Sequence, residues 1–110
     1  MKESDINSKI LILVTVPSRQ VAEQIAKLLL DEKLVACVNI VPNIVSFYWW
    51  EGKTNKDDEF LLLIKSKKTL FDDVSKKIKE VHPYDIPEVI GIEIKLGLKE
   101  YLDWINNEIK

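Results

Sequence analysis

The segment from His82 to Glu88 holds more side chains able to do chemistry than any other stretch of the sequence. It reads His-Pro-Tyr-Asp-Ile-Pro-Glu, so an imidazole, a phenol and two carboxylates share a connection stiffened by two prolines. Histidine together with carboxylates suits copper, zinc or nickel, so His82, Asp85 and Glu88 are candidate metal ligands. The alternative is that His82 only ends a helix, with its ring bonded to a backbone carbonyl.

Cys37 is the one thiol in the sequence. Thiolates bind soft metals, which adds Cys37 to the candidate ligands, although single buried cysteines usually act as small apolar residues. A nucleophilic role would need His82 beside the thiol and an oxyanion hole. The sequence contains no nucleophile motif, glycine-rich phosphate loop, zinc-ribbon spacing or carboxylate dyad. We therefore predict that the protein is not an enzyme.

The first half of the sequence predicts a strand, a helix and a long second strand. Residues 9–16 form an apolar run typical of a strand buried on both faces. Ser18 can cap a helix that continues to about Lys33. Residues 34–50 read as one strand region that Pro42-Asn43 interrupts, which is typical of an edge strand with a bulge or bend.

The second half is predicted to contain a hairpin loop, a strand, a helix, a strand and a short terminal helix, over residues 51–58, 60–64, 69–82, 89–96 and 98–105. Thr69 and Asp72 have the spacing of a capping box at the start of the helix. Glu59 and Lys65 stand at the two ends of the middle strand, where we interpret them as a structural ion pair. The alternative is that they contact a ligand.

This order, β-α-β-β-α-β followed by a helix, predicts a fold of the α/β (α+β) class. Two β-α-β units joined by a long central hairpin form a ferredoxin-like sandwich, with both helices on one face of an antiparallel sheet. No linker, repeat or low-complexity tract divides the sequence. We therefore expect a single domain over residues 10–110, preceded by a flexible leader over residues 1–9.

The composition excludes several classes of protein. The sequence of 110 residues has 16 Lys+Arg and 18 Asp+Glu, so its net charge of −2 argues against a nucleic-acid partner. Its longest apolar run, Ile10 to Val14, is far shorter than the roughly 20 residues of a membrane helix. The single cysteine and the polar N-terminus favour a cytoplasmic protein without a secretory signal.

The apolar pattern also predicts self-association. The runs at residues 10–14 and 60–64 do not alternate, although helices should cover only one face of the sheet. Residues 34–50 would span roughly 55 Å as a strand, which overhangs a domain whose radius of gyration is about 13 Å. The overhang ends in Phe47-Tyr-Trp-Trp50, and the two indoles could stack on a ligand or pack in an interface. We expect a closed oligomer that buries these rings.

Five segments, in this order, resemble the CutA family of divalent-cation tolerance proteins over residues 10–108. They are LVACVNIVP at 34–42, SFYWWEG at 46–52, EFLLLIK at 59–65, HPYDIPE at 82–88 and YLDW at 101–104. The resemblance implies a ferredoxin-like protomer in a stable homotrimer whose long hairpins interlock around the threefold axis. It also implies a role in copper and other divalent-metal binding, tolerance or homeostasis.

The family's trimer is similar to that of the nitrogen-regulatory signalling proteins, which implies clefts between subunits. Residues Cys37, Trp50, Lys65 and Tyr84, with His82 beside them, are predicted to line such a cleft. The alternative function is therefore a non-catalytic trimeric module for small-ligand binding, protein interaction or signalling.

The sequence departs from the family at one candidate copper site. Some bacterial members carry a cysteine before the Thr-x-Pro turn and two adjacent histidines before Pro-Tyr. Val14 and Val81 stand at the cysteine and first histidine positions, and only His82 remains. The resemblance therefore implies a weaker site, in which His82 is joined by Cys37, Tyr84, Asp85 or Glu88 from two subunits.

Overall fold

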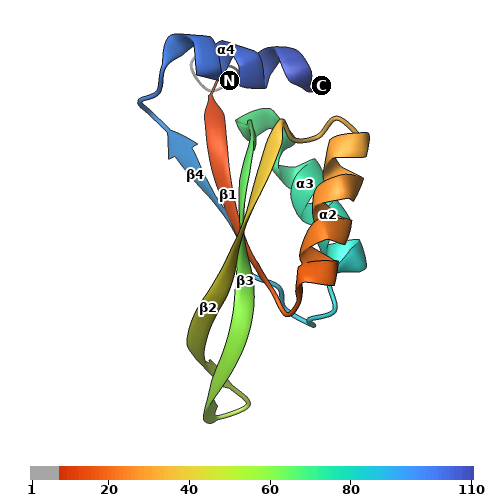
Figure 1. The fold of residues 1–110 in the computed structure, drawn as a ribbon, viewed down its shortest axis with the longest axis vertical. Helices are drawn as coiled ribbons and strands as arrows, with labels where there is room; N and C mark the ends of the chain where they lie inside the picture. The colour runs from red at the N-terminus through yellow and green to blue at the C-terminus, as the bar shows by residue number, and fades with distance from the viewer. Residues whose placement is uncertain (1–7) are drawn as a thin grey trace.

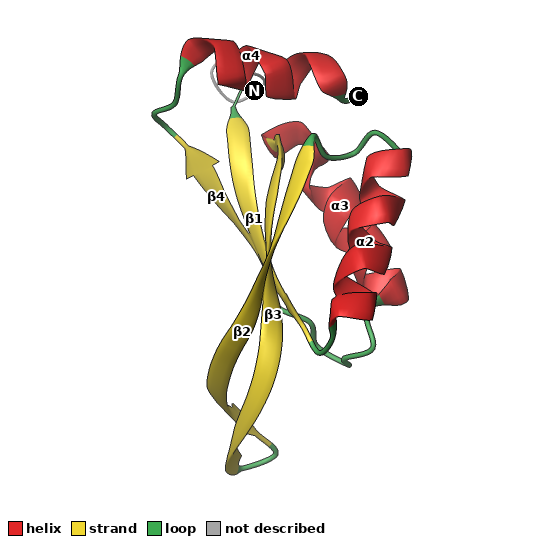
Figure 2. Cartoon of the chain, viewed as in Figure 1, coloured by secondary structure: helices red, strands yellow, loops and turns green. Residues whose placement is uncertain are grey.

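The computed structural model describes residues 8–110, and its centre is a four-stranded antiparallel sheet in the order β2-β3-β1-β4. Helices α2 and α3 lie side by side on one face of this sheet (Figure 1, Figure 2). The elements are β1 Lys9–Val16, α2 Arg19–Asp31, β2 Cys37–Trp50, β3 Lys53–Lys67, the 3-10 helix η1 Lys68–Leu70, α3 Phe71–Val81, β4 Val89–Ile94 and α4 Lys99–Glu108. The predicted ferredoxin-like arrangement is confirmed.

The predicted leader over residues 1–9 falls mostly outside the described residues, which begin at residue 8. Lys9 belongs to β1, where it is buried and pairs with Lys67 and Ile94. The ordered sheet therefore includes the last residue that we assigned to the leader.

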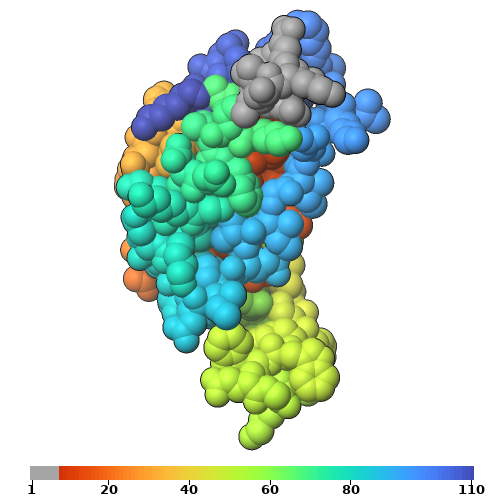
Figure 3. All heavy atoms as spheres, turned by 180° about the vertical axis from the view of Figure 1, so that it is seen from behind, coloured from red at the N-terminus to blue at the C-terminus, as the bar shows by residue number. Residues whose placement is uncertain are grey.

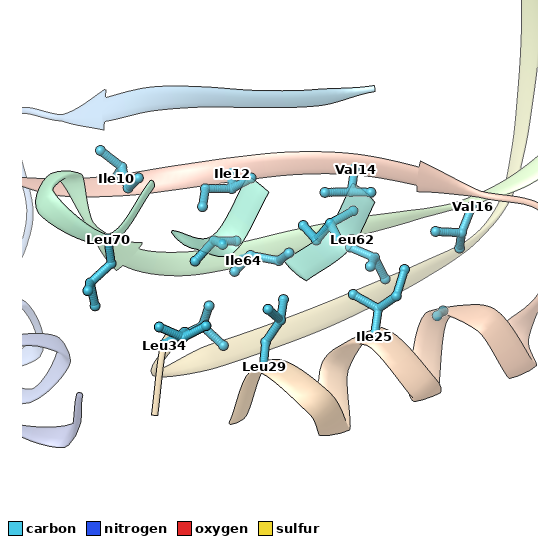
Figure 4. Packing of buried hydrophobic residues seen from close by; sticks show 14 residues of the cluster. Ile10, Ile12, Val14, Val16, Ile25, Leu29, Leu34, Leu62, Ile64 and Leu70 are labelled. Atoms are coloured by element: carbon cyan, nitrogen blue, oxygen red, sulfur yellow. The ribbon is translucent and has the colours of Figure 1, made fainter. Parts of the chain in front are cut away.

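The core lies between the sheet and the two helices. Alternate residues of β1 point toward the helices and are buried, and so are Leu62 and Ile64 of β3 (Figure 4). Ile25 and Leu29 of α2 meet them from the other layer. Helix α2 begins where predicted, because the Ser18 hydroxyl accepts a hydrogen bond of 3.2 Å from the Val21 backbone N–H.

The opposite face of the sheet is covered only at one end. There α4 lies across the strands, with Ile105 fully buried (Figure 1). The leucines of β1 and β3 on this face are half-buried, whereas Ile90 and Ile92 of β4 are exposed. The protomer thus leaves much of an apolar sheet face open, as the unbroken apolar runs predict.

The β2–β3 hairpin extends well beyond the rest of the molecule. With the hairpin included, the molecule measures 44 × 26 × 24 Å along its principal axes. Figure 3 shows its tip projecting below the body of the chain. Phe47 and Trp49 lie on one side of the hairpin and are 74% exposed, while Tyr48 and Trp50 lie on the other and are less exposed. The predicted overhang is confirmed.

The prediction of a hairpin loop over residues 51–58 is wrong. The turn contains only Glu51 and Gly52, with φ values of 51° and 77°, and Trp50 pairs directly with Lys53. Two positive φ values are the signature of a type I′ turn, whose twist matches that of the flanking strands. Residues 53–58 are polar because both faces of the projecting hairpin meet solvent in the protomer, so their polarity does not end the strand.

Several boundaries differ from those predicted. The proposed capping box at Thr69 is wrong, because η1 precedes α3 and no side chain caps its first residue. The proposed Glu59–Lys65 ion pair is also wrong, since six residues of strand separate the two side chains by roughly 20 Å. The predicted bulge in the edge strand is confirmed by the register shift between Val41 and Ile44.

Candidate functional site

The connection between α3 and β4 is fixed to the sheet through His82. Its Nε2 donates to the Thr15 carbonyl at 2.8 Å, and its Nδ1 accepts from the Tyr84 backbone N–H at 3.1 Å. Thr15 lies one position beyond the pair of Val14 with Val89, the first residue of β4. The imidazole therefore extends the hydrogen bonding of β1 beyond this pairing. The ring is 7% exposed. Both ring nitrogens of His82 therefore hold the connection in place. The ring bonds a backbone carbonyl, as in the alternative that the sequence analysis left open.

Tyr84 joins the same connection to β3. Its hydroxyl donates to Glu59 Oε2 at 2.8 Å, and its ring lies 4.7 Å from that of His82. Burial, followed by the hydrogen bond and the negative charge of Glu59, raises the pKa of Tyr84 well above its usual value. The phenol consequently stays protonated near neutral pH and acts as a neutral donor to a carboxylate that is only 6% exposed.

Tyr84 should make the stability of the fold sensitive to alkaline pH. Its pKa is higher in the folded chain than the value of 10.0 taken for an unfolded one, so the folded state holds this proton more strongly. The resulting stability is complete below pH 10 and decreases as the pH rises through the folded pKa. We expect Tyr84→Phe to reduce the loss of stability above about pH 10, relative to the unchanged chain.

The measurement is urea unfolding at a series of pH values, with circular dichroism as the signal that monitors unfolding. Tyr101→Phe is a useful comparison, because burial also raises the pKa of Tyr101, although this residue lies on α4. A Tyr84→Phe variant whose alkaline stability profile is parallel to that of the unchanged chain would contradict the assignment.

A cavity of about 650 Å³ opens between the hairpin and the 82–88 connection. Its lining combines aromatic rings with carboxylates, from Thr15, Ser46, Phe47, Tyr48, Trp49, Trp50, Glu59, Tyr84, Asp85, Ile86 and Glu88. Tyr48 donates to Asp57 on the same side of the hairpin, and this bond raises the pKa of Tyr48. The cavity has the size of many small-molecule sites, which range over roughly 300–1,000 Å³.

A second polar cluster lies on the sheet face opposite α2 and α3, at the end of that face that α4 covers. Lys65 Nζ lies 4.0 Å from Cys37 Sγ and donates to the Asn39 side-chain oxygen. The Cys37 thiol also lies 3.6 Å from that oxygen. The Tyr101 side chain is hydrogen-bonded to Cys37. Burial is the main reason why the pKa of Tyr101 is raised, and the contact with Cys37 adds to the effect. Cys37 therefore sits between a lysine and a phenol, with an amide beside it.

The structure divides the predicted site residues between these two places. Trp50 and Tyr84 line the cavity with Asp85 and Glu88, whereas Cys37 and Lys65 belong to the other cluster. Cys37 and Trp50 are thirteen positions apart along β2, which corresponds to roughly 40 Å. Within residues 8–110, no three His, Cys, Asp or Glu side chains converge on a point that could hold a metal ion. The described part of one chain therefore offers no ready-made site for a tightly bound metal.

Val14 and Val81, which occupy two positions of the candidate copper site, serve the core instead. Val14 is fully buried on the helix-covered face of β1, and Val81 packs against the same cluster. Their side chains complete the packing around the end of α3.

Glu59, Tyr48 and Asp57 belong to the cavity region but were not among the predicted site residues. The position of Glu59 directly before the apolar run of residues 60–64 was the available signal, and we interpreted it as part of an ion pair. Tyr48 and Asp57 could not be placed, because residues 51–58 were expected to form a loop and the cross-strand register was therefore unknown.

Comparison with known proteins finds similarity over nearly the whole chain. The family model described as "CutA1 divalent ion tolerance protein" matches residues 10–108. The chain belongs to the CutA1 family. The "Divalent-cation tolerance protein CutA" of Thermus thermophilus is 47% identical to it over 94 residues, which are 86% of this chain and 91% of the relative.

Solved CutA1 structures share the fold. The Thermus thermophilus CutA1 structure has a TM-score of 0.90 at 43% identity and covers 93% of this chain and 99% of its own. The CutA1 structure from Oryza sativa has a TM-score of 0.91 at 46% identity and covers 94% of each chain. The four-stranded sheet and its helices are therefore the CutA1 fold.

The relatives differ in length and in the compartment that their names give. The rice "Protein CutA 1, chloroplastic" is 46% identical over 92% of this chain, but the match spans only 57% of the rice protein. A structure from Archaeoglobus fulgidus is named as a periplasmic divalent cation tolerance protein. None of the helices in the described part of this chain has the length and apolar character that a membrane crossing requires.

Proposed function

We propose that this CutA1 family member acts in divalent-cation tolerance as a homotrimer that binds divalent cations weakly, at sites shared between subunits. The observation that carries the proposal is the separation of the candidate donors. Cys37 lies on the open sheet face, whereas Asp85 and Glu88 lie at the cavity, so one ion reaches both groups only if two chains meet. The exposed hairpin and the open apolar face supply the surface for that meeting.

His82 has a limited part in this proposal. A metal on its Nδ1 would displace the Tyr84 N–H, and a metal on its Nε2 would displace the Thr15 carbonyl. We therefore assign Cys37, Asp85 and Glu88 as donors, and His82 as a ligand only after it releases the 82–88 connection. A thiolate with carboxylates suits zinc and copper, and the cost of releasing His82 makes the binding weak.

Calorimetric titration of the purified protein with Zn²⁺ tests this proposal, because zinc does not oxidise the thiol. We expect weak binding, with dissociation constants in about the micromolar range, that Cys37→Ser removes. Titrations with Cu²⁺ and Ni²⁺ then give the preference among metals, and Glu23→Gln on the outer side of α2 is the control. The proposal is wrong if neither Cys37→Ser nor His82→Ala changes the binding of any of the three metals.

The second candidate function is a non-catalytic ligand-binding or protein-interaction module. The cavity lined by Trp50 and Tyr84 favours it. We propose that catalysis is absent, because the described partners of the Cys37 thiol are a lysine, an amide and a phenol, and His82 is engaged elsewhere. The net charge of −2 supports the absence of a nucleic-acid partner, and the free thiol supports a cytoplasmic location.

A further inference from the structure

The cavity beside the hairpin carries negative charge that its own lining does not neutralise. Glu59, Asp85 and Glu88 line it, and Asp57 is held at the hairpin by the Tyr48 hydroxyl. Among residues 8–110, no Lys, Arg or His side chain contributes to the lining. Lys79, the nearby cation on α3, donates to the Asp85 backbone carbonyl and not to a carboxylate.

Glu59 is the least solvated of these carboxylates. It is 6% exposed, and its partner in the described part of the chain is the Tyr84 hydroxyl, a neutral donor. No cationic nitrogen of the described residues forms an ion pair with it. A carboxylate withdrawn from water without a cation is costly, so a positively charged occupant of the cavity gains a strong electrostatic partner.

The walls of the cavity indicate what kind of cation fits. The carboxylates do not converge closely enough to coordinate one metal ion. Tyr48, Trp50 and Tyr84 surround the space with aromatic rings, whose faces attract organic cations. A volume of about 650 Å³ also exceeds what a hydrated metal ion requires.

We propose that this cavity binds a small organic ammonium ion, with Glu59 as its counter-ion and the indole and phenol rings as its walls. The proposal gives a ligand class to the second candidate function above. It does not depend on divalent-cation binding, which we assign to Cys37, Asp85 and Glu88.

The test compares benzylammonium with benzyl alcohol, which has nearly the same shape but no charge. Binding is followed by tryptophan fluorescence, since Trp49 and Trp50 line the cavity, and by calorimetry. We expect benzylammonium to bind at least about tenfold more tightly than benzyl alcohol, as a desolvated cation beside aromatic rings and a carboxylate should. Equal affinity of the two probes, or no binding of either, overturns the proposal.

Glu59→Gln isolates the charge, because the amide oxygen still accepts the Tyr84 hydrogen bond. We expect this variant to bind benzylammonium about tenfold or more weakly and benzyl alcohol unchanged. Glu93→Gln is the matched control, since Glu93 lies on β4 and pairs with Lys68 away from the cavity. Unchanged benzylammonium affinity in Glu59→Gln contradicts the proposal.

Two further variants keep the test decisive. If Glu59→Gln does not fold, the double variant Asp85→Asn, Glu88→Gln alters exposed carboxylates of the same cavity and should also weaken benzylammonium binding. Cys37→Ser should leave benzylammonium binding intact while it removes zinc binding. A cavity that the neighbouring subunit fills with its own side chain would exclude both probes, and that result also overturns the proposal.

Discussion

Replacing Phe47 and Trp49 together by alanine is expected to dissociate the proposed homotrimer into separate protomers. Both rings are 74% exposed in the protomer, on the same side of a hairpin that projects from the domain. If neighbouring chains bury them, each truncation costs about 3–5 kcal/mol. A change of that size raises the dissociation constant by about two to three orders of magnitude or more.

Sedimentation velocity over a dilution series from micromolar to nanomolar protein measures this effect. Leu30→Ala, which shortens a side chain on the outer surface of α2, is the control and should leave the mass unchanged. Tyr48→Ala should weaken the assembly less cleanly, because the Tyr48 hydroxyl also bonds Asp57 within the hairpin. An unchanged mass and melting temperature for the Phe47, Trp49 double variant would show that the rings do not form the subunit contact.

Ile12→Ala is expected to destabilise the folded chain by about 2–5 kcal/mol. Ile12 is fully buried at the centre of the sheet, where it pairs with Ile64 of β3 and Gly91 of β4 and faces the two helices. The close packing around it leaves little room for neighbours to collapse into the space that the truncation creates.

Guanidinium unfolding measures the effect. All variants are compared at one fixed protein concentration, because the apparent free energy of unfolding of an oligomer depends on protein concentration. Leu30→Ala should change the free energy of unfolding by no more than about 1 kcal/mol, since Leu30 is 41% exposed. A loss below about 1 kcal/mol for Ile12→Ala would contradict its place in the core.

The fold was predictable because its strongest signals are local. The apolar run of β1, the Ser18 cap and the helical spacing of α2 follow from residues close together in the chain, and the structure confirms them. The β-α-β-β-α-β order then leaves few permitted topologies, so the strand order followed. The bulge at Pro42-Asn43 was predictable for the same reason, since proline cannot donate to a central ladder.

The hairpin was predicted less well because its exposed residues carry no apolar pattern. Residues 53–58 are mostly polar, and the same composition describes a loop and a doubly exposed strand equally well. Only the pairing of Trp50 with Lys53 shows that the turn has two residues. The pairings of Ser46 with Asp57 and of Ile44 with Glu59 follow from that register. They place Glu59 in the lining of the cavity and Asp57 on the same side of the hairpin.

The sequence predicted which residues belong to the candidate site, but it did not predict where they lie relative to one another. The 82–88 connection was correctly singled out, yet spacing alone could not reveal that both nitrogens of His82 are engaged. Nor could it reveal that the Tyr84 hydroxyl bonds Glu59 of β3. Such facts depend on register and on long-range contacts, which a single sequence does not encode in any local pattern.

The two-residue turn at Glu51-Gly52 fixes which aromatic rings share a face of the hairpin with Glu59. Neighbouring residues of a strand point to opposite sides, so a shift of one position in the pairing would exchange the two faces of the hairpin. Phe47 and Trp49 would then stand beside Asp57, and Tyr48 and Trp50 would take the outward side. Gly52 has a positive φ, and no atom lies near the position that a Cβ would occupy. The turn that it forms thus determines which side chains share a face with Glu59, several residues away. The tip of the hairpin acts on that site through geometry alone.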